Sequence, residues 1–173
     1  MLKVGSLFAG IGGIDLAFEQ AGFEIAWANE IDAAACKTYR HNFPNTKLIE
    51  VDIRNLDAKA LEKVDVLTAG FPCQSFSVCG NQKGFKDARG NLFFEITRII
   101  DTKRPKVVFL ENVPNLIEHD DGKTFLVIYN GLAQFGYAVY YRVLASNDYG
   151  NLPQIRKRIY IVAIREDMSD RLY

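Results

Sequence analysis

Short apolar runs alternate with longer segments whose apolar residues recur at helical spacing, and this alternation continues along most of the chain. A short apolar run bounded by glycine, proline or acidic residues is typical of a buried strand, while spacings of three and four residues are typical of an amphipathic helix. The pattern predicts strands at residues 3–9, 24–29, 47–50, 64–69, 106–111, 138–145 and 158–165. It predicts helices at residues 14–21, 33–42, 91–102 and 124–134.

This order of elements predicts an α/β fold, because strands that run parallel need a helical crossover between them. We expect a mostly parallel sheet with helices on both faces, in a single domain over residues 1–173. The strands at 138–145 and 158–165 have no helix-length segment between them, which favours an antiparallel pair at the sheet edge. Residues 71–89 form a long predicted loop, and loops of this length are usually functional.

The composition is that of an ordinary globular protein, with 49% hydrophobic and 24% charged residues. Lysine plus arginine and aspartate plus glutamate both number 21. Bulk charge therefore gives no indication of nucleic-acid binding, which would depend on local basic clusters. Three cysteines favour reduced thiols in the cytoplasm over a disulfide framework. The sequence shows no signal peptide and no apolar run of membrane-spanning length.

Cys73 lies within Phe71-Pro72-Cys73-Gln74, directly after the strand predicted at 64–69. Ligands of open α/β sheets bind beyond the carboxyl ends of the strands, so this thiol is a candidate nucleophile. The alternative is a small buried residue, which is the interpretation we favour for Cys36 and Cys79. Other cysteine sites fit less well. A phosphatase-type loop would need arginine at position 79, which is a cysteine here, and a papain-like site would need a well-placed histidine. A zinc site would need paired ligand spacing, which the three cysteines lack.

Three other predicted strand ends carry residues suited to a nucleotide. Glycines 10, 12 and 13 follow the first strand, Glu30 ends the second and Asp52 follows the third. The glycines lack the full dinucleotide spacing, but a tight turn, a ribose acceptor and a base acceptor suit an adenosine-containing cofactor without a pyrophosphate. The alternative is a simple turn with solvated acids.

Charged residues also mark the last predicted strands. Glu111 ends the strand at 106–111 and would neighbour Cys73 if the fourth and fifth strands are adjacent. Arg156 and Arg158 alternate into the final strand and would point to one face, where their guanidinium groups suit phosphates and carbonyl oxygens. The alternatives are a solvated strand-end acid and edge charges that oppose aggregation.

Taken in chain order, these motifs resemble the DNA (cytosine-5) methyltransferase family. The Pro-Cys-Gln and Glu-Asn-Val pieces are the most specific, and the matching residues are 8–13, 30, 52, 70–77, 89–94, 111–113 and 154–158. The resemblance implies a Rossmann-like fold that uses S-adenosylmethionine as the methyl donor. It implies a cofactor site formed by Phe8, Ala9, Gly10, Ile11, Gly12, Gly13, Glu30, Ile31, Asp52, Ile53, Gly70, Pro72 and Leu92. Glu30 would hold the ribose, and Asp52 with Ile53 the adenine.

The resemblance also implies a covalent reaction on a cytosine flipped out of the duplex. Cys73 would add to C6, and Glu111 would hold the N3 and amino edge of the ring. Arg158 would hold the O2 side, and Arg156 a phosphate or the Cys73 loop. Duplex DNA would be contacted by Gln74, Ser75, Ser77, Lys83, Lys86, Arg89 and Gln154.

Complete family members continue into a target-recognition region and then a Gly-Asn-containing segment that completes the cofactor pocket. Because this chain ends at Tyr173, we expect the catalytic portion alone, either a split subunit needing a partner or a truncated piece. We expect weak methylation or none in isolation, an apolar edge that favours dimers or heterodimers, and a bacterial or phage cytosol as its location. The alternatives are a transfer-RNA cytosine-5 methyltransferase, whose usual motif is Pro-Pro-Cys-Gln-Pro-Phe, and an inactive binding module.

Overall fold

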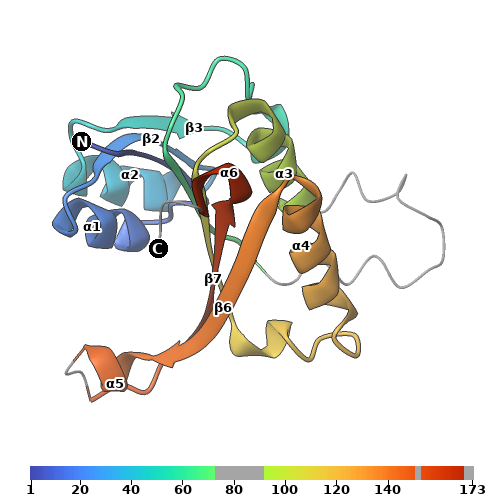
Figure 1. Cartoon of the computed structure of the whole chain (residues 1–173). Helices are drawn as coiled ribbons and strands as arrows, with labels where there is room; N and C mark the ends of the chain where they lie inside the picture. The colour runs from blue at the N-terminus through green and yellow to red at the C-terminus, as the bar shows by residue number, and fades with distance from the viewer. Residues whose placement is uncertain (73–91, 151–152, 170–173) are drawn as a thin grey trace.

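The computed structural model describes residues 1–72, 92–150 and 153–169, which form a seven-stranded sheet with helices on both faces (Figure 1). The strands are β1 (Lys3–Leu7), β2 (Glu24–Glu30), β3 (Lys47–Glu50), β4 (Val66–Gly70), β5 (Val107–Asn112), β6 (Tyr137–Ala145) and β7 (Lys157–Arg165). The helices are α1 (Gly13–Gln20), α2 (Ala33–Asn42), α3 (Leu92–Lys103), α4 (Lys123–Gln134), α5 (Ser146–Tyr149) and α6 (Glu166–Ser169). Two 3₁₀ turns, η1 (Ile53–Asn55) and η4 (Pro114–Leu116), complete the described chain.

The strand order is β3-β2-β1-β4-β5-β7-β6. β1 to β5 pair in parallel, and β7 pairs antiparallel with both β5 and β6. The predicted mostly parallel sheet with an antiparallel edge pair is therefore confirmed. The last strand, however, enters the sheet between β5 and β6, which places the start of β7 beside the carboxyl end of β5.

Element boundaries differ from the sequence prediction by a few residues at most. β1 ends at Leu7 and not at residue 9, because Phe8 adopts a positive φ of 54° that turns the chain out of the sheet. Gly12, with a φ of 94°, completes the turn into α1. Asp32, directly before the predicted helix at 33–42, is the N-cap of α2, since its side chain accepts a hydrogen bond from the backbone N–H of Ala35 at 2.7 Å.

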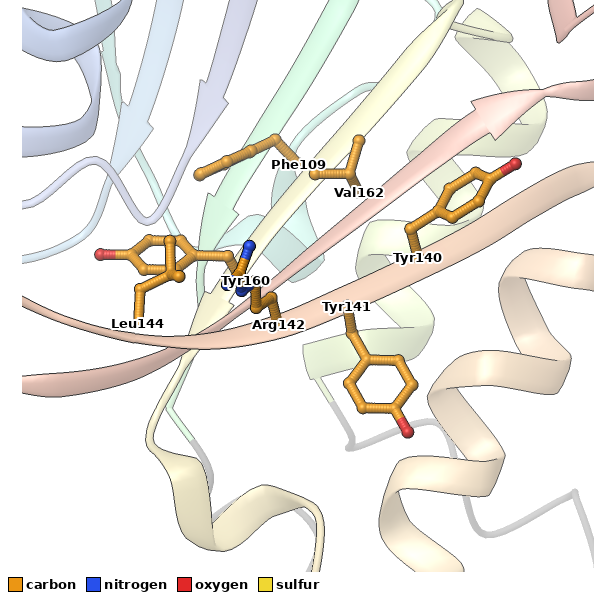
Figure 2. A pocket seen from close by; sticks show the side chains of 7 residues that line it. All are labelled: Phe109, Tyr140, Tyr141, Arg142, Leu144, Tyr160 and Val162. Atoms are coloured by element: carbon orange, nitrogen blue, oxygen red, sulfur yellow. The ribbon is translucent and has the colours of Figure 1, made fainter. Parts of the chain in front are cut away.

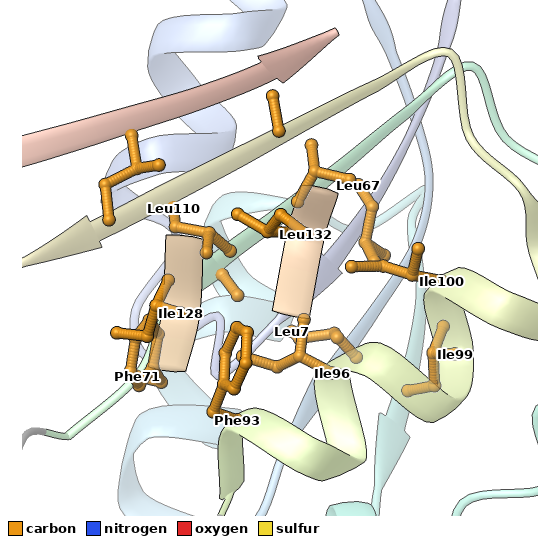
Figure 3. Packing of buried hydrophobic residues seen from close by; sticks show 14 of the residues in the cluster. Leu7, Leu67, Phe71, Phe93, Ile96, Ile99, Ile100, Leu110, Ile128 and Leu132 are labelled. Atoms are coloured by element: carbon orange, nitrogen blue, oxygen red, sulfur yellow. The ribbon is translucent and has the colours of Figure 1, made fainter. Parts of the chain in front are cut away.

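The main hydrophobic core lies between the sheet and helices α3 and α4 (Figure 3). The apolar residues at helical spacing on these two helices are buried, apart from the half-buried Leu92: Phe93, Ile96, Ile99, Ile100, Phe125, Ile128 and Leu132. On the opposite face, Phe18 of α1 packs against a cluster of Val4, Ile25 and Val66. Tyr39 and Phe43, from α2 and its C-terminal cap, form the remaining cluster with Ala28.

The longest helices of the described chain, α3 and α4, each contain 12 residues. Within residues 1–72, 92–150 and 153–169, no helix has both the length and the apolar character needed to cross a bilayer.

Candidate functional site

A cavity of about 370 Å³ lies at the carboxyl ends of the parallel strands, where ligands bind in open α/β sheets. Its walls come from the ends of β2 and β4, the turn after β1, the segment after β3 and the first residue of α3. The lining residues are Phe8, Asn29, Glu30, Ile31, Val51, Asp52, Ile53, Arg54, Gly70, Pro72 and Leu92.

Eight of the residues predicted for the cofactor site line this cavity: Phe8, Glu30, Ile31, Asp52, Ile53, Gly70, Pro72 and Leu92. Five others form the turn beside it: Ala9, Gly10, Ile11, Gly12 and Gly13. Sequence reasoning missed Asn29, Val51 and Arg54. Asn29 precedes Glu30 in β2 and is 2% exposed. The signal that could have identified it in the sequence is a polar residue within an apolar run.

The Glu30 carboxylate is oriented by three backbone amides. Its Oε2 accepts from Gly10 N–H at 2.8 Å, and its Oε1 accepts from Ile31 at 2.8 Å and Asp32 at 2.9 Å. A carboxylate offers about four acceptor positions, so Oε2 retains capacity for a ligand hydroxyl. The bond to Gly10 also joins the glycine turn to the end of β2.

Asp52 is paired with Arg54, a contact that the sequence did not predict. Its Oδ1 accepts from the backbone N–H and the Nε of Arg54, both at 2.9 Å, and its Oδ2 accepts from Nη2 at 2.5 Å. The side-chain hydrogen bond from Arg54 lowers the pKa of the Asp52 carboxyl below its usual value. Any ligand amino group that approaches Asp52 must therefore share this carboxylate with Arg54.

Glu111 and Arg158, both predicted to be catalytic, meet at the next strand end. Arg158 Nε donates to Glu111 Oε1 at 2.8 Å, and each side chain is about one-fifth exposed. Glu111 is in register with Gly70 of β4, and its Oε2 lies 3.6 Å from the position of a β-carbon built on Gly70. Since Gly70 also lines the cavity, the ion pair and the cavity share one wall.

Asn112 connects β5 to the segment that leads to Cys73. Its buried side-chain amide donates to the carbonyl of Phe71 at 2.8 Å, and its Oδ1 accepts from the backbone N–H of Val113 at 2.8 Å. In the sequence this asparagine stands out only as part of the Glu-Asn-Val motif, which predicts no separate role for it. The polar residue next to a strand-end glutamate was the available signal.

Other predicted site residues lie apart from this arrangement or outside the described residues. Arg156 and Gln154 are exposed just before β7, where the Arg156 N–H donates to Ser146 Oγ at 3.1 Å. The residues outside the described ranges are Cys73, Gln74, Ser75, Ser77, Cys79, Lys83, Lys86 and Arg89. Cys36 is fully buried on α2. Among residues with described positions, no group of three or more His, Cys, Asp or Glu side chains could hold a metal ion.

Residues 2–172 match the family described as C-5 cytosine-specific DNA methylase. The chain belongs to this family. The resemblance found from the motifs and the methyltransferase fold expected from it are thereby confirmed, and the family match covers every strand of the sheet.

Two curated relatives of this chain are type II methyltransferases. M.Bsp6I of Bacillus sp. (strain RFL6) is 57% identical over 95% of this chain and 53% of the relative. M.HhaI of Haemophilus parahaemolyticus is 46% identical over 97% of this chain and 50% of the relative. A solved mutant of DNMT2 from Spodoptera frugiperda superposes with a TM-score of 0.79 at 28% identity, over 98% of this chain and 51% of that one. The chain thus spans about half the length of these proteins.

Proposed function

We propose that this chain is the catalytic portion of a DNA (cytosine-5) methyltransferase, which moves a methyl group from S-adenosylmethionine to C5 of a cytosine flipped out of the duplex. The observation that carries the proposal is the position of Gly70. This residue lines the strand-end cavity and stands beside the Glu111–Arg158 pair, so a methyl donor and a target base could meet there.

The cavity suits S-adenosylmethionine in size and chemistry. Its volume of about 370 Å³ is within the range of small-molecule sites. Glu30 has a preset carboxylate for ribose hydroxyls, and Phe8, Ile53 and Leu92 supply apolar walls. Asp52 would accept the adenine amino group while it remains paired with Arg54. When bound, the cofactor supplies an electrophilic methyl group.

Cys73 is the proposed nucleophile. Its thiolate would form a bond to C6 of the cytosine, and the C5=C6 electron pair would move to C5. C5 would then take the methyl group, and the donor would leave as S-adenosylhomocysteine. Loss of the C5 proton would return the electron pair to C5=C6 and break the bond from sulfur to C6, which releases the thiolate. Flipping is required because C5 and C6 are covered by neighbouring bases in the duplex.

Glu111 and Arg158 would bind the ring during this sequence. Glu111 Oε2, which faces the end of β4, would accept from the cytosine amino edge. Arg158 would donate to O2, and its existing bond to Glu111 would hold both groups in one orientation. Arg156 and Gln154, exposed before β7, would lie toward the DNA. The proposal places this reaction in the cytosol of a bacterium or a phage-infected cell.

A covalent trap tests the assignment of the nucleophile. A duplex containing 5-fluorocytosine cannot lose a proton from C5, so the adduct between Cys73 and C6 should persist. We expect a stable protein–DNA adduct with S-adenosylmethionine and the complementing segment described below, and no adduct with Cys73→Ser. An adduct that survives this substitution would show that the nucleophile lies elsewhere. Methyl incorporation into DNA and into transfer RNA, measured side by side, distinguishes the two substrates.

An apolar face beside α1 supports the proposed need for a partner (Figure 2). Phe18 of α1 covers Phe109 of β5 through an edge-to-face contact with the ring centroids 5.3 Å apart. Beyond Phe109, a groove of about 490 Å³ continues over β7 and β6, lined by Phe109, Tyr140, Tyr141, Arg142, Leu144, Tyr160 and Val162. Tyr140 is 56% exposed. Apolar patches of this kind usually mark an interaction surface.

We propose that a segment equivalent to the second half of the relatives, on a separate chain or on this one, covers this face and carries target recognition. The C-terminal half of M.Bsp6I, supplied as a second chain, provides the probe. Analytical ultracentrifugation should show a one-to-one complex, and Tyr140→Glu should weaken it. Formation of the complex should restore methylation. A clean monomer at all concentrations, with and without the second chain, would contradict the proposal.

A further inference from the structure

Helix α3 carries two cationic side chains that donate hydrogen bonds to backbone carbonyls of the connection between β3 and β4. Arg98 reaches the carbonyls of Ile53 and Leu56, while Lys103 reaches those of Lys59 and Leu61. Both side chains thus donate to backbone carbonyls, but at different positions along the connection. Only the Arg98 contact falls on the part of the connection that lines the strand-end cavity, because Ile53 is a lining residue.

Arg98 spans the 3₁₀ turn η1 from one end to the other. Its Nη2 donates to Ile53 O at 2.8 Å and its Nη1 to Leu56 O at 3.0 Å. Its Nε donates to Glu95 Oε2 at 2.7 Å, one turn earlier on α3. The planar guanidinium is thus fixed at three nitrogens, and charge-assisted bonds of this geometry resist displacement.

The opposite end of the same wall is held by Asn29. Its side-chain amide donates to Ile49 O and Val51 O, both at 2.9 Å, just before Asp52. Residues 51–54 therefore lie between two side-chain anchors, one from β2 and one from α3. Since α3 begins at Leu92, another lining residue, Arg98 connects two walls of the cavity that are separate in sequence.

We propose that Arg98 is a positioning residue for the methyl-donor site, which fixes the wall formed by Asp52, Ile53 and Arg54 without touching the ligand. This inference rests on the proposed function. Loss of the guanidinium would free the carbonyls of Ile53 and Leu56 and let η1 shift, so that the adenine side of the cavity would no longer be preset. Cofactor affinity would fall through lost preorganisation.

Isothermal titration of the chain with S-adenosylhomocysteine tests the inference, because binding is measured without turnover. Arg98→Ala should raise Kd roughly tenfold, the scale expected for losing charged hydrogen bonds that organise a site. Arg98→Lys keeps the charge but can reach one carbonyl at a time, so its Kd should lie in between. Lys103→Ala is the matched control, and its Kd should stay within about twofold because its carbonyl partners lie away from the cavity.

Thermal unfolding of each variant separates positioning from stability, with all titrations run well below the lowest Tm. Guanidinium ion at about 20 mM, far below denaturing concentrations, should restore part of the affinity of Arg98→Ala and leave Lys103→Ala unchanged. If Arg98→Ala and Lys103→Ala lose stability but bind alike, Arg98 is structural and the inference fails while the proposed function stands. If wild type binds no S-adenosylhomocysteine, with or without the complementing segment, the proposed function fails and this inference with it.

Discussion

Arg158 Nε lies 2.8 Å from Glu111 Oε1, across the antiparallel boundary between β7 and β5. The contact exists because β7 enters the sheet in the opposite direction to β5. The first residues of β7 therefore stand at the edge where β5 and the other parallel strands end. A parallel strand at this position would have placed Arg158 at the far end of the sheet.

Glu111→Gln should lower methyl transfer by about a hundredfold or more, because it removes a charged acceptor that acts mainly in the transition state. Cofactor affinity should change little, since Glu111 does not line the cavity. Single-turnover methylation with the complementing segment, together with titration of S-adenosylhomocysteine, measures both effects. Glu118→Gln, at an exposed position, is the control. Equal losses in the two variants would contradict the role of Glu111.

Asn112→Ala should destabilise the fold by about 1–3 kcal/mol, because it removes the buried hydrogen bond from the Asn112 amide to the carbonyl of Phe71. The substitution should also slow adduct formation by Cys73, which follows Phe71 by two residues. Urea unfolding and the 5-fluorocytosine trap measure the two effects. Asn147→Ala removes an exposed side-chain bond to Asp148 and should change neither. Normal stability for Asn112→Ala would remove the basis of this prediction.

Gly12→Ala should destabilise the protein far more than Gly13→Ala. Gly12 has a φ of 94°, and a β-carbon there would clash with the ring of Phe43, whereas a β-carbon on Gly13 meets open space. The expected losses are about 2 kcal/mol or more for Gly12→Ala and below about 0.5 kcal/mol for Gly13→Ala. Chemical unfolding of both variants gives the comparison, and similar losses would show that the turn tolerates a side chain at position 12.

The contribution of Asp15 to stability should fall as the pH rises. Burial raises the pKa of its carboxyl above 3.8, while hydrogen bonds from Ser6 and Tyr39 oppose the shift. The folded state therefore holds this proton more tightly than the unfolded state does. The stabilising contribution is complete below pH 3.8 and is lost as the pH rises through the folded-state pKa.

Two substitutions around Asp15 should change this pH profile in opposite directions. Asp15→Asn removes the titration, so the variant should gain stability relative to wild type as the pH rises above 3.8. Tyr39→Phe removes the hydroxyl donor 2.6 Å from Asp15 Oδ2. This should raise the pKa of Asp15 further and increase the loss of stability with rising pH. Urea unfolding across a pH series measures both. Parallel profiles for all three proteins would show that Asp15 does not titrate in this range.

The sequence by itself determined the elements, the family and the position of most of the cavity. Apolar periodicity located the strands, and Glu30, Asp52 and Gly70 were placed at their ends by counting along the chain. These features are local, because a strand and the residue that ends it are neighbours in sequence. The glycine turn and the Asp32 cap were predictable for the same reason.

Only the tertiary structure decided which of these ends meet and how their side chains are engaged. The insertion of β7 beside β5 brought Arg158 to Glu111, 47 residues apart in number, and the packing of α3 brought Arg98 to the carbonyls of Ile53 and Leu56. Even the neighbouring pair Asp52 and Arg54 gave no sequence signal, since their contact depends on the turn of η1. Strand order, direction and side-chain hydrogen bonding are set by packing over the whole sheet, and residue preferences along the chain do not encode them.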